Sequence, residues 1–159
     1  MSDEGAPPAA EDLDRWHRTM APLAFNQAWE FLDQEELTRE EEEAMLAAAF
    51  AQRHHWYQVG EPRNLAIADW QVARVAAVLG YADLARRFAE RSLDVVRRHD
   101  LGPFLEGFAH EALARAAAWV DDLDTFTYHL EAAKALVPEI EDATERELLE
   151  ADLAEMSER

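Results

Sequence analysis

The segment LAIADWQVARVAAVL, residues 65–79, has only three polar side chains, those of Asp69, Gln71 and Arg74. Wound as a helix, it places apolar side chains on nearly every side, and a helix that is apolar all round packs against several neighbours. Nothing in the chain alternates with period two between hairpin turn signals, as a strand would. We therefore predict a central helix here, covered by other helices.

The same pattern returns further along the chain. Residues 62–96 align without a gap with residues 103–137, and Pro22, Pro62 and Pro103 follow one another at spacings of 40 and 41 residues. Proline is favoured at the first position of a helix. A two-helix repeat of this length indicates hairpins that stack, because none of them can bury its own apolar face. A plain helical bundle is the alternative.

Capping and breaking residues set the expected helix ends. Thr38 with Glu41 three residues later forms a capping box at one helix start. The expected helices cover residues 14–21 as a short lead-in, then 22–33, 39–59, 63–79, 82–99, 104–120, from 121 or 122 to 137, and 141–156. We predict a disordered acidic tail over residues 1–14 and a single domain over residues 15–159. The fold class is all-α: three stacked antiparallel helix hairpins with a C-terminal capping helix.

The charge of the chain excludes several classes of partner. Among 159 residues there are 34 acidic and 15 basic side chains, a formal net charge of −19. A nucleic acid or an anionic membrane surface requires clustered Lys and Arg, so neither is an expected partner. The absence of cysteine excludes disulfides and thiolate zinc sites. No apolar run reaches about 18 residues, and the N-terminus lacks the basic region of a signal peptide. We expect a cytoplasmic protein.

The two-helix repeat also carries a family resemblance. Small residues recur at helical spacing, and a tryptophan precedes the first of them by three positions. The residues concerned are Trp70, Ala73, Ala85 and Ala89. Over roughly residues 20–157 the chain resembles the tetratricopeptide-like family of α-helical repeats, which implies stacked hairpins and a concave binding surface. It also resembles an uncharacterised group of small bacterial helical proteins, a resemblance that implies no activity. The residues of this second likeness are His55, Trp56, residues 60–64, Trp70 and Arg74.

A first hypothesis for a site is a divalent metal held by histidine and carboxylate. Glu106 and His110 stand four residues apart on one helix, and the repeat alignment sets Asp69 opposite His110. His55, or its neighbour His54, ends the preceding helix close to the start of the central one. Imidazole with carboxylate suits zinc, iron or manganese. The alternative is that Glu106 and His110 form a solvated helix edge and that His54 packs in the core.

A second hypothesis is a ligand groove. Aromatic side chains would line it, and two arginines in a very acidic chain would recognise an anionic group. The residues proposed for it are Trp56, Asn64, Trp70, Arg74, Glu111 and Arg115. The alternative is that the aromatic side chains are core, that Arg115 pairs with Glu111, and that Arg74 pairs with Asp69 or Asp83.

Two functions follow from these hypotheses. The first is an interaction or scaffold module that binds a protein segment or small ligand on its concave face and needs no cofactor. The second is a metal-binding protein or metal-dependent enzyme that uses the histidine and carboxylate cluster, so enzyme activity stays open. A homodimer would bury apolar surface of the two central helices and is a further possible assembly.

Overall fold

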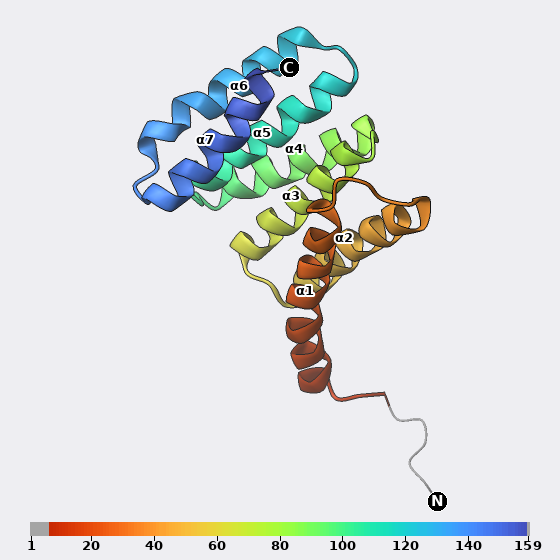
Figure 1. Cartoon of the computed structure of the whole chain (residues 1–159). Coiled ribbons are helices and arrows are strands. Elements are labelled where there is room, and N and C mark those ends of the chain that lie inside the picture. Colours follow the sequence, from red (N-terminus) through yellow and green to blue (C-terminus); the bar gives the residue numbers. More distant parts are fainter. Residues whose placement is uncertain (1–6, 159) are drawn as a thin grey trace, which may run out of the picture.

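The structure is a computed structural model that describes residues 7–158. The described chain folds into α-helices joined by short turns, with a single 3-10 turn before the last helix (Figure 1). The elements are α1 (Ala10–Leu32), α2 (Arg39–Val59), α3 (Pro62–Val78), α4 (Ala82–Arg98), α5 (Pro103–Trp119), α6 (Leu123–Leu136), η1 (Val137–Glu139) and α7 (Ala143–Ser157). The predicted all-α class is confirmed.

Consecutive helices pair as hairpins, α1 with α2, α3 with α4 and α5 with α6. The middle hairpin contacts both others, because α3 packs on α2 and α5 while α4 packs on α5. The last helix, α7, lies against α5 and α6 and closes the C-terminal end of the stack (Figure 1). Three stacked hairpins with a capping helix are the predicted architecture, and the structure confirms it.

Helices α3 and α5 are the central ones, as their apolar composition predicts. Each hides polar side chains along with its alanines: Asp69 and Gln71 in α3, His110 and Glu111 in α5. Buried alanines such as Ala73 and Ala109 let the helices approach closely, and larger residues from the flanking helices fill the remaining space. A polar group in such a core must have a partner, since leaving it unpaired costs about 1–3 kcal/mol.

Helix α1 differs from the prediction. It begins at Ala10 and continues through Pro22 to Leu32, so the separate lead-in helix and the start at Pro22 are wrong. The predicted tail is helical from residue 10 onward, while residues 1–6 lie outside the described chain. Pro22 cannot donate to the carbonyl of Arg18, but both residues are exposed, so water can satisfy that carbonyl. Proline at this position therefore does not end the helix.

The remaining helix ends lie within two residues of their predicted positions. The capping box of Thr38 and Glu41 forms at the start of α2. The side chain of Asp122 accepts a hydrogen bond from the backbone N–H of Thr125 and so caps α6. Across residues 7–158, no helix combines the length and the hydropathy that a membrane crossing needs.

Candidate functional site

The four predicted metal ligands do not come together. His55 points toward α1, Asp69 is bound by arginines of α2 and α4, and only Glu106 and His110 are neighbours, 3.8 Å apart. Within residues 7–158, the one group of histidines and carboxylates with metal-site spacing is His17, His54 and His55. The convergent histidine and carboxylate site predicted from the sequence is therefore not observed. One reason is that His55 pairs with His17 of α1, and the other is that Asp69 is taken up by Arg53 and Arg91.

Asp69 is fully buried, and an ion-pair network with partly exposed arginines holds it. Arg53 Nε lies 2.6 Å from its Oδ1, and the Tyr57 hydroxyl donates to its Oδ2. Arg91 completes the network at 3.9 Å. Burial and the hydrogen bond to Asp69 raise the pKa of Tyr57. Both carboxylate oxygens are occupied, so Asp69 ties α3 to its neighbours and is not available to a metal.

Glu106 and His110 belong to a second network with Arg97 and His129. Arg97 Nε lies 3.2 Å from Glu106 Oε1, and the Nδ1 atoms of His110 and His129 are 2.9 Å apart. Burial, His129 and Arg97 lower the pKa of His110 to about 4. Burial and then Arg97 also lower the pKa of His129. Both imidazoles are therefore neutral at pH 7, and one donates to the other.

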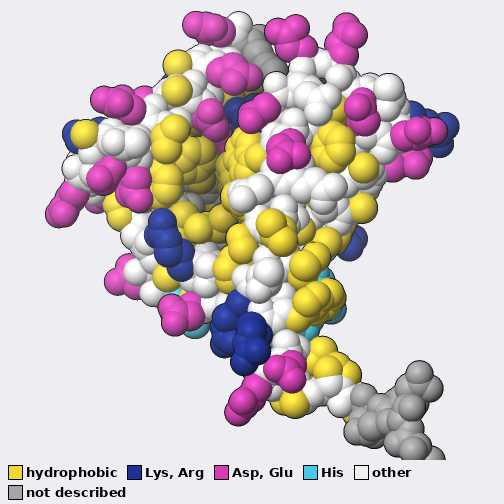
Figure 2. Space-filling view, turned by 60° about the horizontal axis from the view of Figure 1, so that its bottom comes forward, with side chains coloured by type: hydrophobic (Ala, Val, Ile, Leu, Met, Phe, Trp, Pro, Cys, Tyr) yellow, Lys and Arg dark blue, Asp and Glu magenta, His cyan; other side chains and the backbone are white. Residues whose placement is uncertain are grey.

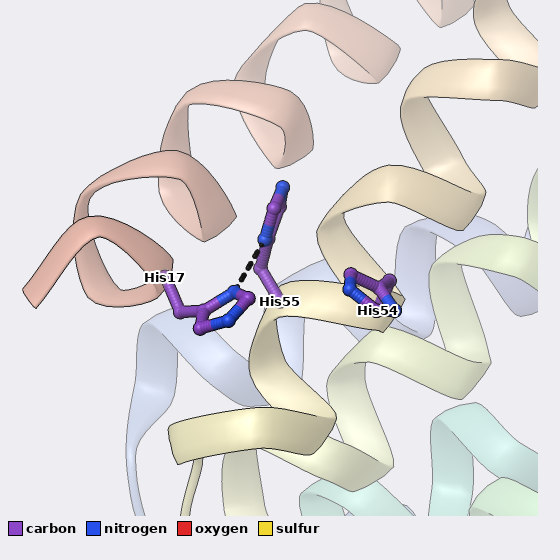
Figure 3. Close-up of side chains that lie close together, drawn as sticks. All are labelled: His17, His54 and His55. Carbon is purple, nitrogen blue, oxygen red and sulfur yellow. Dashed lines mark hydrogen bonds between the residues drawn. The ribbon is translucent and has the colours of Figure 1, made fainter. Parts of the chain in front are cut away.

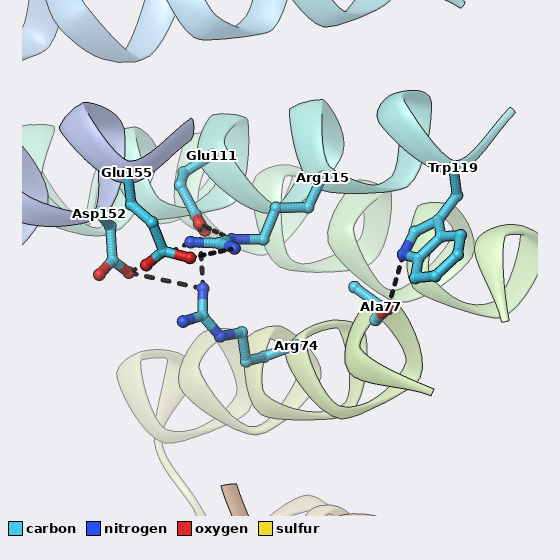
Figure 4. Close-up of polar contacts among 7 residues, drawn as sticks. All are labelled: Arg74, Ala77, Glu111, Arg115, Trp119, Asp152 and Glu155. Carbon is cyan, nitrogen blue, oxygen red and sulfur yellow. Dashed lines mark hydrogen bonds and ion pairs between the residues drawn. The ribbon is translucent and has the colours of Figure 1, made fainter. Parts of the chain in front are cut away.

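Two arginines share one buried carboxylate between α3, α5 and α7 (Figure 4). Arg74 Nη1 lies 3.1 Å from Oε1 of Glu111, and Arg115 Nε donates to the same oxygen. Asp152 of α7 lies 3.6 Å from Arg74 and 4.0 Å from Arg115. Burial raises the pKa of Glu111, against the opposing effect of Arg115 and Arg74. Arg115 thus pairs with Glu111 as one alternative predicted, but Arg74 takes its acids from α5 and α7, and not from Asp69 or Asp83.

An apolar groove of about 320 Å³ opens beside this cluster. Its walls come mainly from the first helix of each hairpin and from α7, with Ser92 contributed by α4. We call it the aromatic groove, lined by Trp29, Ala66, Ile67, Trp70, Arg74, Ser92, Phe104, Leu105, Phe108, Leu148 and Asp152. The ring centroid of Trp70 lies 5.9 Å from that of Trp29 and 5.5 Å from that of Phe108. Figure 2 shows a face whose hollow gathers hydrophobic side chains, with acidic side chains around much of it.

One polar atom in the groove wall has no partner. The indole N–H of Trp70 is buried, and no acceptor within the described residues reaches it. An unsatisfied donor of this kind costs stability unless water or a ligand supplies an acceptor. Trp70 is also the middle ring of three packed aromatic side chains, between Trp29 and Phe108. The groove wall therefore combines apolar surface with a buried N–H that has no partner among the described residues.

A larger pocket, of about 600 Å³, lies at the end of the molecule where α5 turns into α6. Its walls include Arg115, Trp119, Leu123 and Phe126. The Trp119 indole N–H already donates to the carbonyl of Ala77, at 2.6 Å (Figure 4). Leu123 is 73% exposed, so the pocket is open at its rim. Despite its volume, it lacks the continuous aromatic wall of the smaller groove.

The six predicted ligand residues fall in different places. Trp70 and Arg74 line the aromatic groove, and Arg115 lines the larger pocket. Glu111 lies buried between the guanidinium groups of Arg74 and Arg115. Asn64 accepts a hydrogen bond from the Glu61 backbone N–H at 3.0 Å and so caps α3. Trp56 lies in α2 and lines neither pocket. Of the six residues, only Trp70 and Arg74 line the aromatic groove.

The sequence reasoning missed the groove residues that come from the ends of the chain. The sequence could have indicated Trp29, since it lies on the apolar stripe of its helix. Leu148 carried a weaker signal: it follows the stripe of the last helix, but Leu149 and Leu153 are buried while Leu148 is 54% exposed at the groove.

Neither a protein-family model, nor a curated protein, nor a solved structure matches this chain.

Proposed function

We propose that this protein is a tetratricopeptide-like interaction module whose aromatic groove binds a partner protein segment. The observation that supports it is the groove itself, an apolar concavity lined mainly by the first helix of every hairpin and by α7. Stacked helical hairpins create a concave surface of this kind by geometry. A volume of about 320 Å³ accommodates one or two large side chains of a partner.

The side chain that enters the groove should be aromatic or large and aliphatic. Trp29, Trp70 and Phe108 offer ring faces and edges, and aromatic pairs contribute about 0.5–1.5 kcal/mol beyond the area they bury.

In the partner segment, one side chain enters the groove as an anchor, and the residues on either side of it should be basic. The protein has a net charge of −19, so its field attracts cations and repels acidic segments. Arg74 does not reverse this preference at the groove, because Glu111 and Asp152 already neutralise its charge. Complementary charge speeds encounter and selects against wrong partners more than it adds affinity. The proposed ligand is thus an apolar anchor between lysines or arginines.

Selection from a random peptide library displayed on phage tests this proposal. We expect enriched peptides to carry an aromatic or aliphatic anchor with flanking Lys or Arg. Leu148→Glu should abolish their binding, because it places a charge on the exposed rim of the groove. Leu123→Glu is the matched control, since Leu123 is also exposed but lines the other pocket. Absence of enrichment, or peptides that bind Leu148→Glu as well as the parent protein, would contradict the proposal.

A small-molecule ligand is the other possible occupant of the same groove. Screening a library of aromatic fragments by ligand-observed NMR distinguishes the two. Fragments that bind while no peptide does would assign the groove to a small ligand. In both cases Leu148→Glu locates the binding at the groove, and unchanged binding to that variant would place it elsewhere.

A further inference from the structure

Three histidines meet where α1 crosses α2, away from the aromatic groove (Figure 3). His17 comes from α1, and His54 and His55 come from the last turns of α2. The Nδ1 atoms of His17 and His55 are 2.8 Å apart. One potential ligand nitrogen from each of the three rings lies within 4.8 Å of the others. No element of the proposed groove function uses these side chains.

We propose that His17, His54 and His55 form a binding site for Zn²⁺. Neutral imidazole is a common zinc ligand, and three histidines with one open position are a recurrent zinc coordination set. The set contains no carboxylate, so it does not suit Mg²⁺ or Ca²⁺, which prefer oxygen. His55 is 8% exposed, whereas His54 is exposed and His17 is half-buried. The ion can therefore enter from the solvent side and keep a water as its fourth ligand.

The spacing of the rings is close to what zinc requires. Zn–N bonds of about 2.0–2.1 Å in a tetrahedron set the ligand nitrogens about 3.4 Å apart. The His17–His55 pair, at 2.8 Å, must open slightly, and His54 must move inward from the 4.8 Å limit. Ring rotations on two helices supply such changes without moving the backbone. In the hydrogen-bonded His17–His55 pair one Nδ1 carries the proton, so that ring must shift its proton to Nε2 or bind through Nε2.

Zinc bound here would fasten the first half of α1 to α2. Figure 1 shows that the N-terminal half of α1 projects beyond the other hairpins. Trp16, 50% exposed, packs its ring edge-on to His55 at a centroid distance of 5.0 Å. The metal would bind only when α1 lies on α2, so zinc should stabilise the folded chain by mass action. Binding and unfolding are thus two independent measures of one site.

The test is a zinc titration of the full chain, measured by isothermal titration calorimetry. The protein is first freed of metals with a chelator. We expect one Zn²⁺ per chain and a higher melting temperature in the presence of zinc. His54→Ala should weaken zinc binding at least about 100-fold, more than the loss of a residue outside the ligand shell costs. His54 is exposed and makes no hydrogen bond among the described residues, so the variant keeps the fold. His17→Ala should have the same effect on zinc binding.

Two controls make the result specific. His129→Ala breaks the other close histidine pair and should leave zinc binding unchanged. Replacing Zn²⁺ by Mg²⁺ measures the stabilisation that any cation attracted by the 34 acidic side chains provides, and this part should be equal in the parent protein and in His54→Ala. No saturable zinc binding, equal binding by His54→Ala, or a loss of binding in His129→Ala would each overturn the proposal. Since the groove lies elsewhere, none of these outcomes bears on peptide binding by the groove.

Discussion

Glu111 is the acid on which the α3–α5–α7 contact depends. It is fully buried and accepts hydrogen bonds from both Arg74 and Arg115. Two arginines thus compensate one buried negative charge. Removing one partner of a buried ion pair is costly, because the remaining charge stays desolvated. The second arginine reduces that cost in this site. Arg74 also lines the aromatic groove. It could therefore stabilise the fold or contact a bound peptide.

Arg74→Met separates these two roles. We expect a loss of about 2 kcal/mol in the free energy of unfolding, less than for an isolated buried pair because Arg115 remains on Glu111. Binding of the selected peptides should change little. Urea unfolding and peptide titration check both quantities. Arg86→Met is the control, since Arg86 makes only exposed pairs with Asp83 and Glu90 and its loss should cost much less. Normal stability with lost peptide binding would make Arg74 a recognition residue.

His110 gives the protein a pH-dependent stability. Its pKa in the folded state is about 4 and its ordinary value is 6.5, so the unfolded chain binds more protons between these values. Stability is therefore complete above pH 6.5 and is lost as pH falls toward 4. The groups that face His110 are His129, Arg97 and Glu106.

Between pH 7 and 5 the share of His110 in this loss is about 2 kcal/mol. His110→Gln should reduce the loss of unfolding free energy between pH 7 and 5 by about that amount, while His99→Gln, at an exposed site, should leave this loss unchanged. Urea unfolding at a series of pH values measures it. Equal slopes for the parent and His110→Gln would show that His110 already titrates normally in the folded protein.

At the scale of helices, local signals predict most of the fold. The capping boxes, the prolines at the first turns of α3 and α5, and the glycines between helices act through backbone hydrogen bonds within a few residues. Gly80 and Gly102 take positive φ values, of 80° and 95°, where a side chain would be strained. Such signals are visible in the sequence. The exception is α1, where proline lies on an exposed helix face and burial of Ala21, Ala24 and Ala28 outweighs the missing hydrogen bond.

Pro22→Ala tests that interpretation of α1. In a continuous helix the alanine restores the N–H that can donate to Arg18 and removes the ring clash, effects worth about 3 kcal/mol. The unfolded chain regains freedom without proline, which offsets up to about 1 kcal/mol. We expect a net stabilisation of about 2 kcal/mol in thermal or urea unfolding. Pro62→Ala, at the first position of α3, should give no gain. A loss of stability in Pro22→Ala would mean that a helix starts at this proline after all.

At the scale of the whole molecule, the sequence predicts the stack but only part of the sites. The alignment of residues 62–96 with residues 103–137 pairs Arg74 with Arg115, and the structure joins the two through Glu111. The groove, however, combines Trp29 and Leu148, which lie near opposite ends of the chain. His17 likewise meets His55 across 38 positions of sequence. Contacts of this kind depend on how helices cross, and neither spacing nor propensity encodes the crossing of α1 over α2 or of α7 over α5.

The net charge of −19 makes a final prediction about salt, with opposite signs for folding and for binding. Raising ionic strength from about 0.01 to 1 M shortens the Debye length from about 30 to 3 Å. Repulsion among the acidic side chains weakens, while the fully buried carboxylates of Asp69 and Glu111 are little screened, so the melting temperature should rise with salt. Affinity for a peptide with basic flanks should fall over the same range, because its attraction to the acidic surface is screened. The same peptide with its lysines replaced by glutamine should bind with an affinity that hardly changes with salt. The affinity of the basic peptide could instead stay constant while the melting temperature rises. Recognition would then rest on apolar contact alone, and charge would have no part in the proposed specificity.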